Sequence, residues 1–357
     1  MLSVHGTDSP TLAAPRSSPR FDTIMAGVST WMVLGLYIDG WSHRHVALDT
    51  FFSPYHAIFY SGYLAFAVLI LLTLAKGILA GLPFRQALPV GYGKSLLGLI
   101  LHGAGGVVDM AWHQVFGFEL SSEALVSPPH LMIFAGLTLI VSGPLRAAWL
   151  RPEQAALPSR RYWTPMLISL ALLWSVLTFG TLILHPIVAP HAIKSRWVMY
   201  ASFPGPALDM ARTVSIGSFI VQSAITAGLL LLLIRRWQLP RLALTLVFTA
   251  NAALLSLLDD QYWLILPSLC SGWATDWLLT RLQPCGRRPW TVRLVAATVP
   301  LVSTTGYFIT LAATAGVGWS ATMVTGAITL SAMTGLLISY MVFPPPTPTH
   351  RASEHGI

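Results

Sequence analysis

Residues 56–80 read HAIFYSGYLAFAVLILLTLAKGILA, a stretch with one lysine and no arginine, aspartate or glutamate. A helix of about 20 apolar residues crosses the hydrocarbon core of a bilayer, where only a helix or a closed barrel satisfies its own backbone hydrogen bonds. This stretch therefore predicts a membrane-spanning helix. Comparable apolar stretches recur between residue 24 and residue 343.

The composition of the chain agrees with a polytopic membrane protein. Charged residues make up 10% of the 357 residues and apolar residues 54%, whereas soluble proteins carry about 25% charge. The two cysteines imply no disulfide framework. The net charge of +8 does not indicate nucleic-acid binding, because the basic residues lie between hydrophobic runs and form no patch. We predict an all-α bundle of about ten transmembrane helices, at residues 24–39, 56–80, 92–112, 128–148, 163–186, 213–234, 240–258, 262–280, 292–314 and 320–343.

The basic residues are divided unevenly between the two ends of these helices. With ten spans, 17 of the 21 lysines and arginines fall on the side of both termini. The positive-inside rule then predicts a cell (inner) membrane protein with cytoplasmic termini and extracytoplasmic metal sites. We expect four regions: a disordered tail at 1–23, a four-helix unit of two hairpins at 24–150, a six-helix region at 151–343 and a second disordered tail at 344–357.

Two segments of the four-helix unit repeat one pattern. In each, an aspartate precedes a histidine by four residues, and a second histidine lies three residues after the serine of a Ser-Pro pair. Residues four apart share a helix face, and Ser-Pro is a favourable helix start with serine as the N-cap. Each hairpin is therefore expected to gather its three side chains. The six residues are Asp39, His43 and His56 in the first segment, and Asp109, His113 and His130 in the second.

Two imidazoles and one carboxylate suit a divalent transition metal and leave coordination positions open. A single Asp–His pair could instead be a buried hydrogen-bonded pair, but its repetition with Ser-Pro favours two metal sites, because ionisable residues inside membranes are costly and usually functional. His102, in mid-span, is expected to bond a neighbouring helix. Four further groups could support the ligands without binding metal, although the two glutamates could simply be solvated: His45, Asp49, Glu119 and Glu123.

The stretch DGWSHRHVALDTFFSPYHAIFY, from Asp39 to Tyr60, resembles the copper-binding stretch of one membrane subunit of the particulate methane and ammonia monooxygenases, the copper membrane monooxygenase family. That family has Asp-x-x-x-His, then Asp-Thr-x-Phe-Thr-Pro-Ser-His, then Phe-Tyr, and a second, similar hairpin follows. The family usually begins the second motif with asparagine where this chain has Asp109. The resemblance covers roughly residues 25–140. The matching residues are Asp39, His43, Asp49, Thr50, Phe52, Pro54, His56, Phe59 and Tyr60 in the first motif, and Asp109, Trp112, His113, Glu123, Pro128 and His130 in the second.

The resemblance implies a copper-binding subunit of a membrane monooxygenase or oxidase. Such a subunit would work with other subunits on a small apolar substrate dissolved in the lipid. Two alternatives remain open at this point. A metal transporter or metal-delivery protein would need polar residues through the bilayer, for which His102, Asn251 and Asp276 are candidates. An iron- or zinc-dependent membrane hydroxylase or hydrolase would use the same two histidines and carboxylate.

Overall fold

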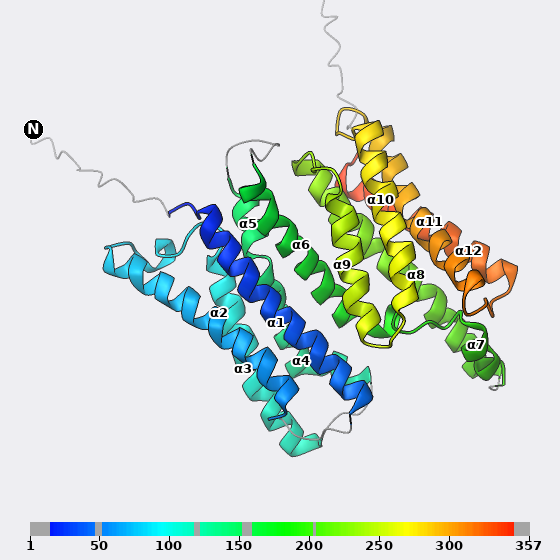
Figure 1. The fold of residues 1–357 in the computed structure, drawn as a ribbon, viewed down its shortest axis with the longest axis horizontal. Helices are drawn as coiled ribbons and strands as arrows, with labels where there is room; N and C mark the ends of the chain where they lie inside the picture. The colour runs from blue at the N-terminus through cyan, green and yellow to red at the C-terminus, as the bar shows by residue number, and fades with distance from the viewer. Residues whose placement is uncertain (1–14, 47–51, 118–121, 152–158, 203–204, 346–357) are drawn as a thin grey trace, which may run out of the picture. The chain divides into compact units, whose positions relative to one another are not determined.

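The computed structural model describes residues 15–46, 52–117, 122–151, 159–202 and 205–345, and these are all-helical, without a β-strand among them. Among these residues, seven helices are long and apolar enough to cross a membrane, and Figure 1 labels each of them. They are α1 (Pro19–His45), α2 (Pro54–Leu79), α3 (Gly93–Phe116), α6 (Arg160–Gly180), α8 (Gly205–Arg236), α11 (Pro289–Ala313) and α12 (Ala321–Val342).

A broken helix raises this number to eight if its two parts count as one span. α4 (Pro128–Val141) and α5 (Gly143–Trp149) meet at an angle of 46°. The break falls at Gly143-Pro144, where proline removes a backbone donor and clashes with a continuing helix. The expected straight span at 128–148 is therefore bent. Arg146 stabilises the bend, because its guanidinium donates to the carbonyl of Leu139 at 2.9 Å, at the end of α4.

The ten expected spans are not confirmed. The expected spans 240–258 and 262–280 correspond to α9 (Ala243–Leu257), with 15 residues, and α10 (Ile265–Leu282), with 18. α9 is shorter than the seven helices above, and α10 does not reach their hydropathy. The remaining elements are α7 (Lys194–Ala201) and four short 3-10 helices, η1 (Phe84–Gln86), η2 (Ser122–Val126), η3 (Leu182–Leu184) and η4 (Tyr262–Leu264).

The chain divides into two compact units. The first combines Met1–Ala189 with Leu246–Leu266, and the second combines Pro190–Thr245 with Pro267–Ile357. The first unit thus extends beyond the expected four-helix region, because α6 packs against both α1 and α4. In the second unit α8, α11 and α12 pack together. There the carboxylate of Asp276 accepts bonds from the backbone N–H groups of Leu244 and Thr245, at 3.2 and 2.8 Å, and so caps the start of α9.

The first helix begins earlier than the sequence predicted. α1 starts at Pro19, after the N-cap Ser18 whose hydroxyl accepts from the backbone N–H of Phe21 at 3.1 Å. The expectation of a disordered tail as far as residue 23 is therefore wrong for residues 19–23, while residues 1–14 lie outside the described part. Asp22 holds this first turn in place. Its buried carboxylate accepts a hydrogen bond from the Tyr92 hydroxyl at 2.8 Å and pairs with Arg151.

Glycines set the distance between the helices of each hairpin. In the first, α1 and α2 lie side by side (Figure 1). A Cβ added at Gly35 would lie 2.6 Å from the Cα of Phe59. In the second, α3 and α4 approach equally closely, and a Cβ at Gly136 would lie 2.5 Å from the backbone nitrogen of His102. Only a residue without a Cβ fits such a backbone approach. These glycines therefore bring the paired helices close enough for their polar side chains to meet.

The glycines belong to the same repeat as the aspartates and histidines. Gly35 and Gly105 each lie four residues before the aspartate of their hairpin, and Gly62 and Gly136 each lie six residues after its second histidine. All four would clash with the facing backbone if they carried a Cβ, three of them at less than 3.0 Å and Gly105 at 3.0 Å from the backbone nitrogen of Ile133. The repeat therefore extends from the side chains into the packing of the helices.

Candidate metal centre

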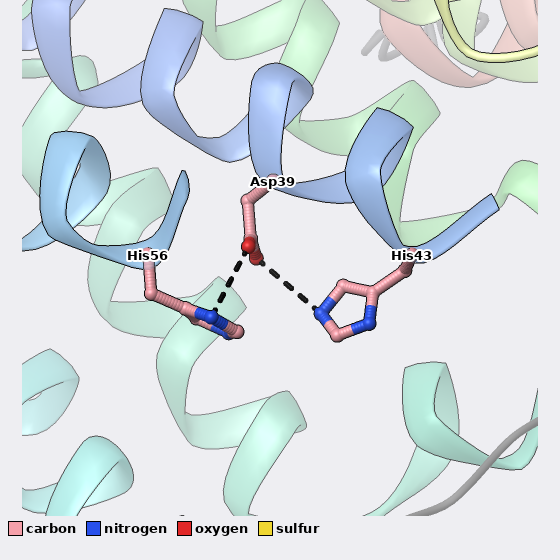
Figure 2. Close-up of side chains that lie close together, drawn as sticks. All are labelled: Asp39, His43 and His56. Carbon is pink, nitrogen blue, oxygen red and sulfur yellow. Dashed lines mark ion pairs between the residues drawn. The ribbon is translucent and has the colours of Figure 1, made fainter. Parts of the chain in front are cut away.

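The first triad comes together where α1 ends and α2 begins. Asp39 and His43 lie one turn apart on α1, His56 lies in the first turn of α2, and the three side chains point toward one another (Figure 2). Asp39 Oδ2 lies 3.8 Å from His43 Nε2, and Asp39 Oδ1 lies 3.4 Å from His56 Nδ1. One ligand atom from each residue fits within a group whose members all lie within 4.8 Å of one another.

The start of α2 holds His56 in place. Ser53 is the N-cap, and its hydroxyl accepts from the backbone N–H of His56 at 3.1 Å. The same hydroxyl lies 2.7 Å from Nδ1 of the His56 ring. The expected Ser-Pro helix start is confirmed here, and the serine orients the imidazole as well as capping the helix.

The second triad has the same arrangement in the hairpin of α3 and α4. Asp109 Oδ2 lies 3.4 Å from His113 Nε2, and Asp109 Oδ1 lies 3.3 Å from His130 Nδ1. Ser127 is the N-cap residue of α4 with proline in the first turn, as expected, but its hydroxyl accepts no backbone N–H of α4 and instead donates to the carbonyl of Ala124 at 3.2 Å. It still lies 2.8 Å from Nδ1 of His130, as Ser53 does from His56.

The carboxylate-to-imidazole distances of both triads fit a bound metal ion, and among the described residues the three ligand atoms of the first triad alone lie close enough together to share one. Two ligand atoms held about 2.1 Å from one tetrahedral ion are about 3.4 Å apart. The carboxylate-to-imidazole distances of 3.3–3.8 Å match this spacing, whereas a charge-assisted N–H···O bond would measure about 2.7–2.9 Å. Oδ1 of Asp39 and Oδ1 of Asp109 are buried and make no hydrogen bond with the described residues. A buried carboxylate oxygen without a donor is costly unless a cation satisfies it.

The two triads share one polar region of the first unit. His113 and His130 of the second hairpin lie within electrostatic range of His43 and His56 in the first. Asp39 and Asp109 both act on the phenol of Tyr60 in α2. The candidate centre is therefore a pair of neighbouring sites at the same end of the two hairpins.

The structure directs His45 away from the triads. Its Nδ1 lies 2.9 Å from the carbonyl of Trp41, and its Nε2 lies 3.1 Å from Oδ2 of Asp260. Beside it, Arg44 pairs with Asp259 at 3.3 Å. These pairs join the end of α1 to the segment after α9, more than two hundred residues later. Sequence spacing gave no signal for this contact, because it depends on the tertiary fold.

The other expected supporting groups are not described in detail. Asp49 and Glu119 lie outside the described residues. Glu123 lies on η2, but its side chain is also outside the described part. Within the part of the chain that the structure describes, the first triad is the one group of three acidic, histidine or cysteine residues with ligand atoms close enough for a shared ion.

The polar residues considered for a transport path each have a packing role. His102 Nδ1 lies 3.0 Å from the carbonyl of Ile133, which confirms the expected bond to a neighbouring helix. Asn251 accepts from the hydroxyl of Thr178 at 2.9 Å. Asp276 caps α9 in the second unit. Each of the three side chains therefore stabilises helix packing through a hydrogen bond.

One histidine outside the expected spans, His191, also joins no group of metal ligands among the described residues. His191, in the segment between α6 and α7, is half-buried, and its burial, followed by the charge of Arg196, lowers its pKa. The neutral imidazole that results is the form that binds metal, but among the described residues it joins no group of three ligands.

Comparisons of the chain with protein families, with curated proteins and with solved structures find no match. The likeness to the copper membrane monooxygenases therefore depends on the motifs in residues 25–140 alone.

Proposed function

We propose that this protein is a metal-binding membrane protein that holds two copper ions in the two hairpins of its first unit. One observation carries the proposal: in both hairpins a buried aspartate lies 3.3–3.8 Å from two histidines, and its Oδ1 makes no hydrogen bond with the described residues. Seven or eight apolar helices support a lipid environment for this centre. Copper is the preferred ion because imidazole-rich sites bind it most tightly among the divalent first-row metals.

We further propose that the chain is a subunit of a membrane oxidase or monooxygenase. The resemblance of Asp39–Tyr60 to the copper-binding stretch of the monooxygenase family supports this interpretation. Bound copper would supply redox and Lewis-acid chemistry, and the chain's own part is to hold it with three ligands and leave positions open. A small apolar substrate could reach the helix ends through the lipid. Other subunits would complete the enzyme, and mild-detergent purification followed by mass analysis tests for them.

The metal centre is proposed to face the extracytoplasmic side. The support is the 17 of 21 basic residues that fall on the side of the termini when the alternation of ten spans is applied. A single cysteine at position 121 should react with an impermeant reagent in intact cells. Labelling only after the cytoplasmic side is opened would reverse the orientation.

Metal content tests the central proposal directly. Full-length protein purified in detergent, loaded with copper and freed of excess metal should hold about two ions per chain, one at each three-ligand site. His43→Ala and His113→Ala should each remove about one ion while expression stays near normal, because a site with two remaining ligands binds much more weakly.

His45→Ala is the matched control. It lies two residues from His43 but pairs with Asp260, so its loss should leave both ions in place. Unchanged metal content in both ligand variants would return the triads to hydrogen-bonded helix-end pairs. Loading with iron or zinc in preference to copper would instead favour a hydroxylase or hydrolase of that metal.

A further inference from the structure

The second unit carries many arginines, and neither carboxylate among its described residues is available to balance them. Asp209, near the start of α8, pairs with Arg212 at 3.0 Å. The carboxylate of Asp276 is engaged by the start of α9. Seven arginines lie at the far end of α8, near the start of α9, at the end of α10 and around the start of α11: Arg235, Arg236, Arg241, Arg281, Arg287, Arg288 and Arg293.

Three helix ends converge where these arginines lie. Leu231 near the end of α8 and Val292 at the start of α11 belong to one buried hydrophobic cluster, against which Phe343 at the end of α12 packs. The loop before α11 reaches the same place, since a Cβ added at Gly286 would lie 3.8 Å from the Phe343 ring. Four arginines adjoin these contacts in the chain, and together they define the arginine cluster: Arg235, Arg287, Arg288 and Arg293.

The charges of the arginine cluster are not neutralised within the described part of the chain. None of its four members makes an ion pair or a side-chain hydrogen bond with the described residues. Arg235, Arg287 and Arg288 are exposed. Arg293 is half-buried, and its guanidinium carbon lies 4.2 Å from the centre of the Tyr340 ring of α12, a cation–π contact that holds this charge in place.

The surroundings of the arginine cluster match the boundary between lipid and water. α8, α11 and α12 are three of the helices that are long and apolar enough to cross a membrane, and the cluster lies at their ends. Trp290, in the first turn of α11, is 61% exposed, and Tyr340 is 44% exposed. Tryptophan and tyrosine are enriched at the level of the lipid headgroups. Met341, which follows Tyr340, is 77% exposed and offers apolar surface to an acyl chain.

We propose that the arginine cluster binds the headgroup of an anionic phospholipid. The proposal needs a membrane around the second unit but no metal, so it is independent of the copper sites. Guanidinium groups bind phosphate oxygens in pairs, and basic groups between the ends of membrane helices bind anionic headgroups. The three exposed arginines are free to contact the phosphate, while Arg293 adds a fixed positive charge beside them.

Lipid titration of the full-length protein in a neutral detergent tests this site. Native mass spectra should show one tightly retained phosphatidylglycerol, bound about tenfold or more above phosphatidylcholine. The double variant Arg287→Gln/Arg288→Gln should weaken phosphatidylglycerol binding about thirtyfold, because two charges near an anionic headgroup are lost. Thermal stability should stay unchanged, since both side chains are exposed and make no ion pair with the described residues.

A second pair of exposed arginines provides the matched control. Arg160 and Arg161 begin α6 of the first unit. There Arg151 lies over the ring of Tyr162 and pairs with Asp22, so a carboxylate balances part of the local charge. Arg160→Gln/Arg161→Gln removes the same net charge and should weaken phosphatidylglycerol binding no more than about threefold.

Three results would overturn the proposal. Equal weakening by the two double variants would reduce the effect to net charge. Equal retention of phosphatidylcholine and phosphatidylglycerol would remove the preference for an anionic headgroup. Displacement of the bound lipid by inorganic phosphate at the same concentration would assign the arginine cluster to a free anion in place of a lipid.

Discussion

The hairpin of α1 and α2 and the hairpin of α3 and α4 place the same side chains at the same steps, yet the first brings its histidines closer. The ring centres of His43 and His56 lie 5.3 Å apart, and those of His113 and His130 lie 6.3 Å apart. In the first hairpin a serine caps the second helix with its hydroxyl, and in the second it does not. Both copies therefore share the positions of the three polar residues, and they differ in the distance between the histidines and in the capping bond of the serine.

The backbone contacts are the part that the repeat fixes. Position 32 of α1 and position 102 of α3 correspond, and each lies under a glycine of the facing helix. The first copy has Met32 there, and the second has His102, which adds a polar contact to the carbonyl of Ile133 at 3.0 Å. The residue at this position can differ between the copies because the facing glycine lies against its backbone. The spacing of the helices therefore fixes where each triad forms, and the neighbouring side chains adjust the distances between its ligands.

The largest expected effect comes from breaking the shared backbone contact. Gly35→Ala and Gly136→Ala would each force a Cβ to within 2.6 Å of the facing backbone. Overpacking of this kind costs about 1–3 kcal/mol, and it should also separate the ligands of its own hairpin. Thermal unfolding in detergent and copper content measure the two consequences.

Matched controls lie on the same helices. An added Cβ at Gly27 of α1 or Gly106 of α3 would meet nothing within 4 Å. Alanine there should be neutral or stabilising by about 0.5–1 kcal/mol, since it restricts the unfolded backbone. If Gly35→Ala were as stable as Gly27→Ala and kept its copper, the glycine contacts would not set the spacing of the triads.

The sequence predicts the side-chain pattern of both hairpins because the pattern is local. A four-residue separation specifies one helix face, so Asp39 with His43 and Asp109 with His113 could be paired without a structure. The start of α2 after Ser53 was equally predictable, since an N-cap depends on neighbouring residues. Ser127 shows the limit of this reasoning, because its hydroxyl turns to a carbonyl in its own loop.

What the sequence could not predict depends on partners distant in the chain. His45 was expected to support the metal ligands, but it bonds instead to Asp260, which lies 215 residues later in the chain. Arg146 donates to the carbonyl of Gly91, just before α3, and Arg151 pairs with Asp22 in the first turn of α1, so both bond to groups distant in the chain. The Gly143-Pro144 dipeptide favours a helix break, but a prediction from hydrophobicity alone gives one continuous span there. The packing role of Gly35 required knowledge of the backbone that faces it.

An intermediate effect should separate the two carboxylates. Asp39→Asn and Asp109→Asn keep an oxygen ligand and remove its charge, so each should weaken copper binding at its own site by about 10–100-fold. Copper competition titrations measure this. The first site should lose more, because among the described residues its three ligand atoms are the ones that lie close enough together to share an ion. A larger loss in Asp109→Asn would mean that the second site is the stronger of the two.

The smallest expected effect comes from the two serines, and it distinguishes helix capping from support of the ligands. Ser53→Ala removes both the cap of α2 and the contact at 2.7 Å with His56, whereas Ser127→Ala removes no capping bond but the contact at 2.8 Å with His130 and the bond to the carbonyl of Ala124. Loss of a cap costs about 1 kcal/mol, so Ser53→Ala should lower thermal stability more than Ser127→Ala. Loss of a group that orients a ligand weakens metal binding by about 10–100-fold, so both variants should weaken their own site.

Both measurements are made on the same detergent-purified samples, thermal unfolding without metal and copper competition with it. Threonine provides the conservative comparison, because its hydroxyl can restore the cap at position 53 and the ring contact at both positions. Ser53→Thr and Ser127→Thr should therefore recover most of the affinity that alanine loses. Equal stability of the two alanine variants would show that the Ser53 cap adds nothing to α2. Unaltered copper affinity in both would mean that the imidazoles are held by helix packing alone, which would leave the glycines as the determinant of each triad.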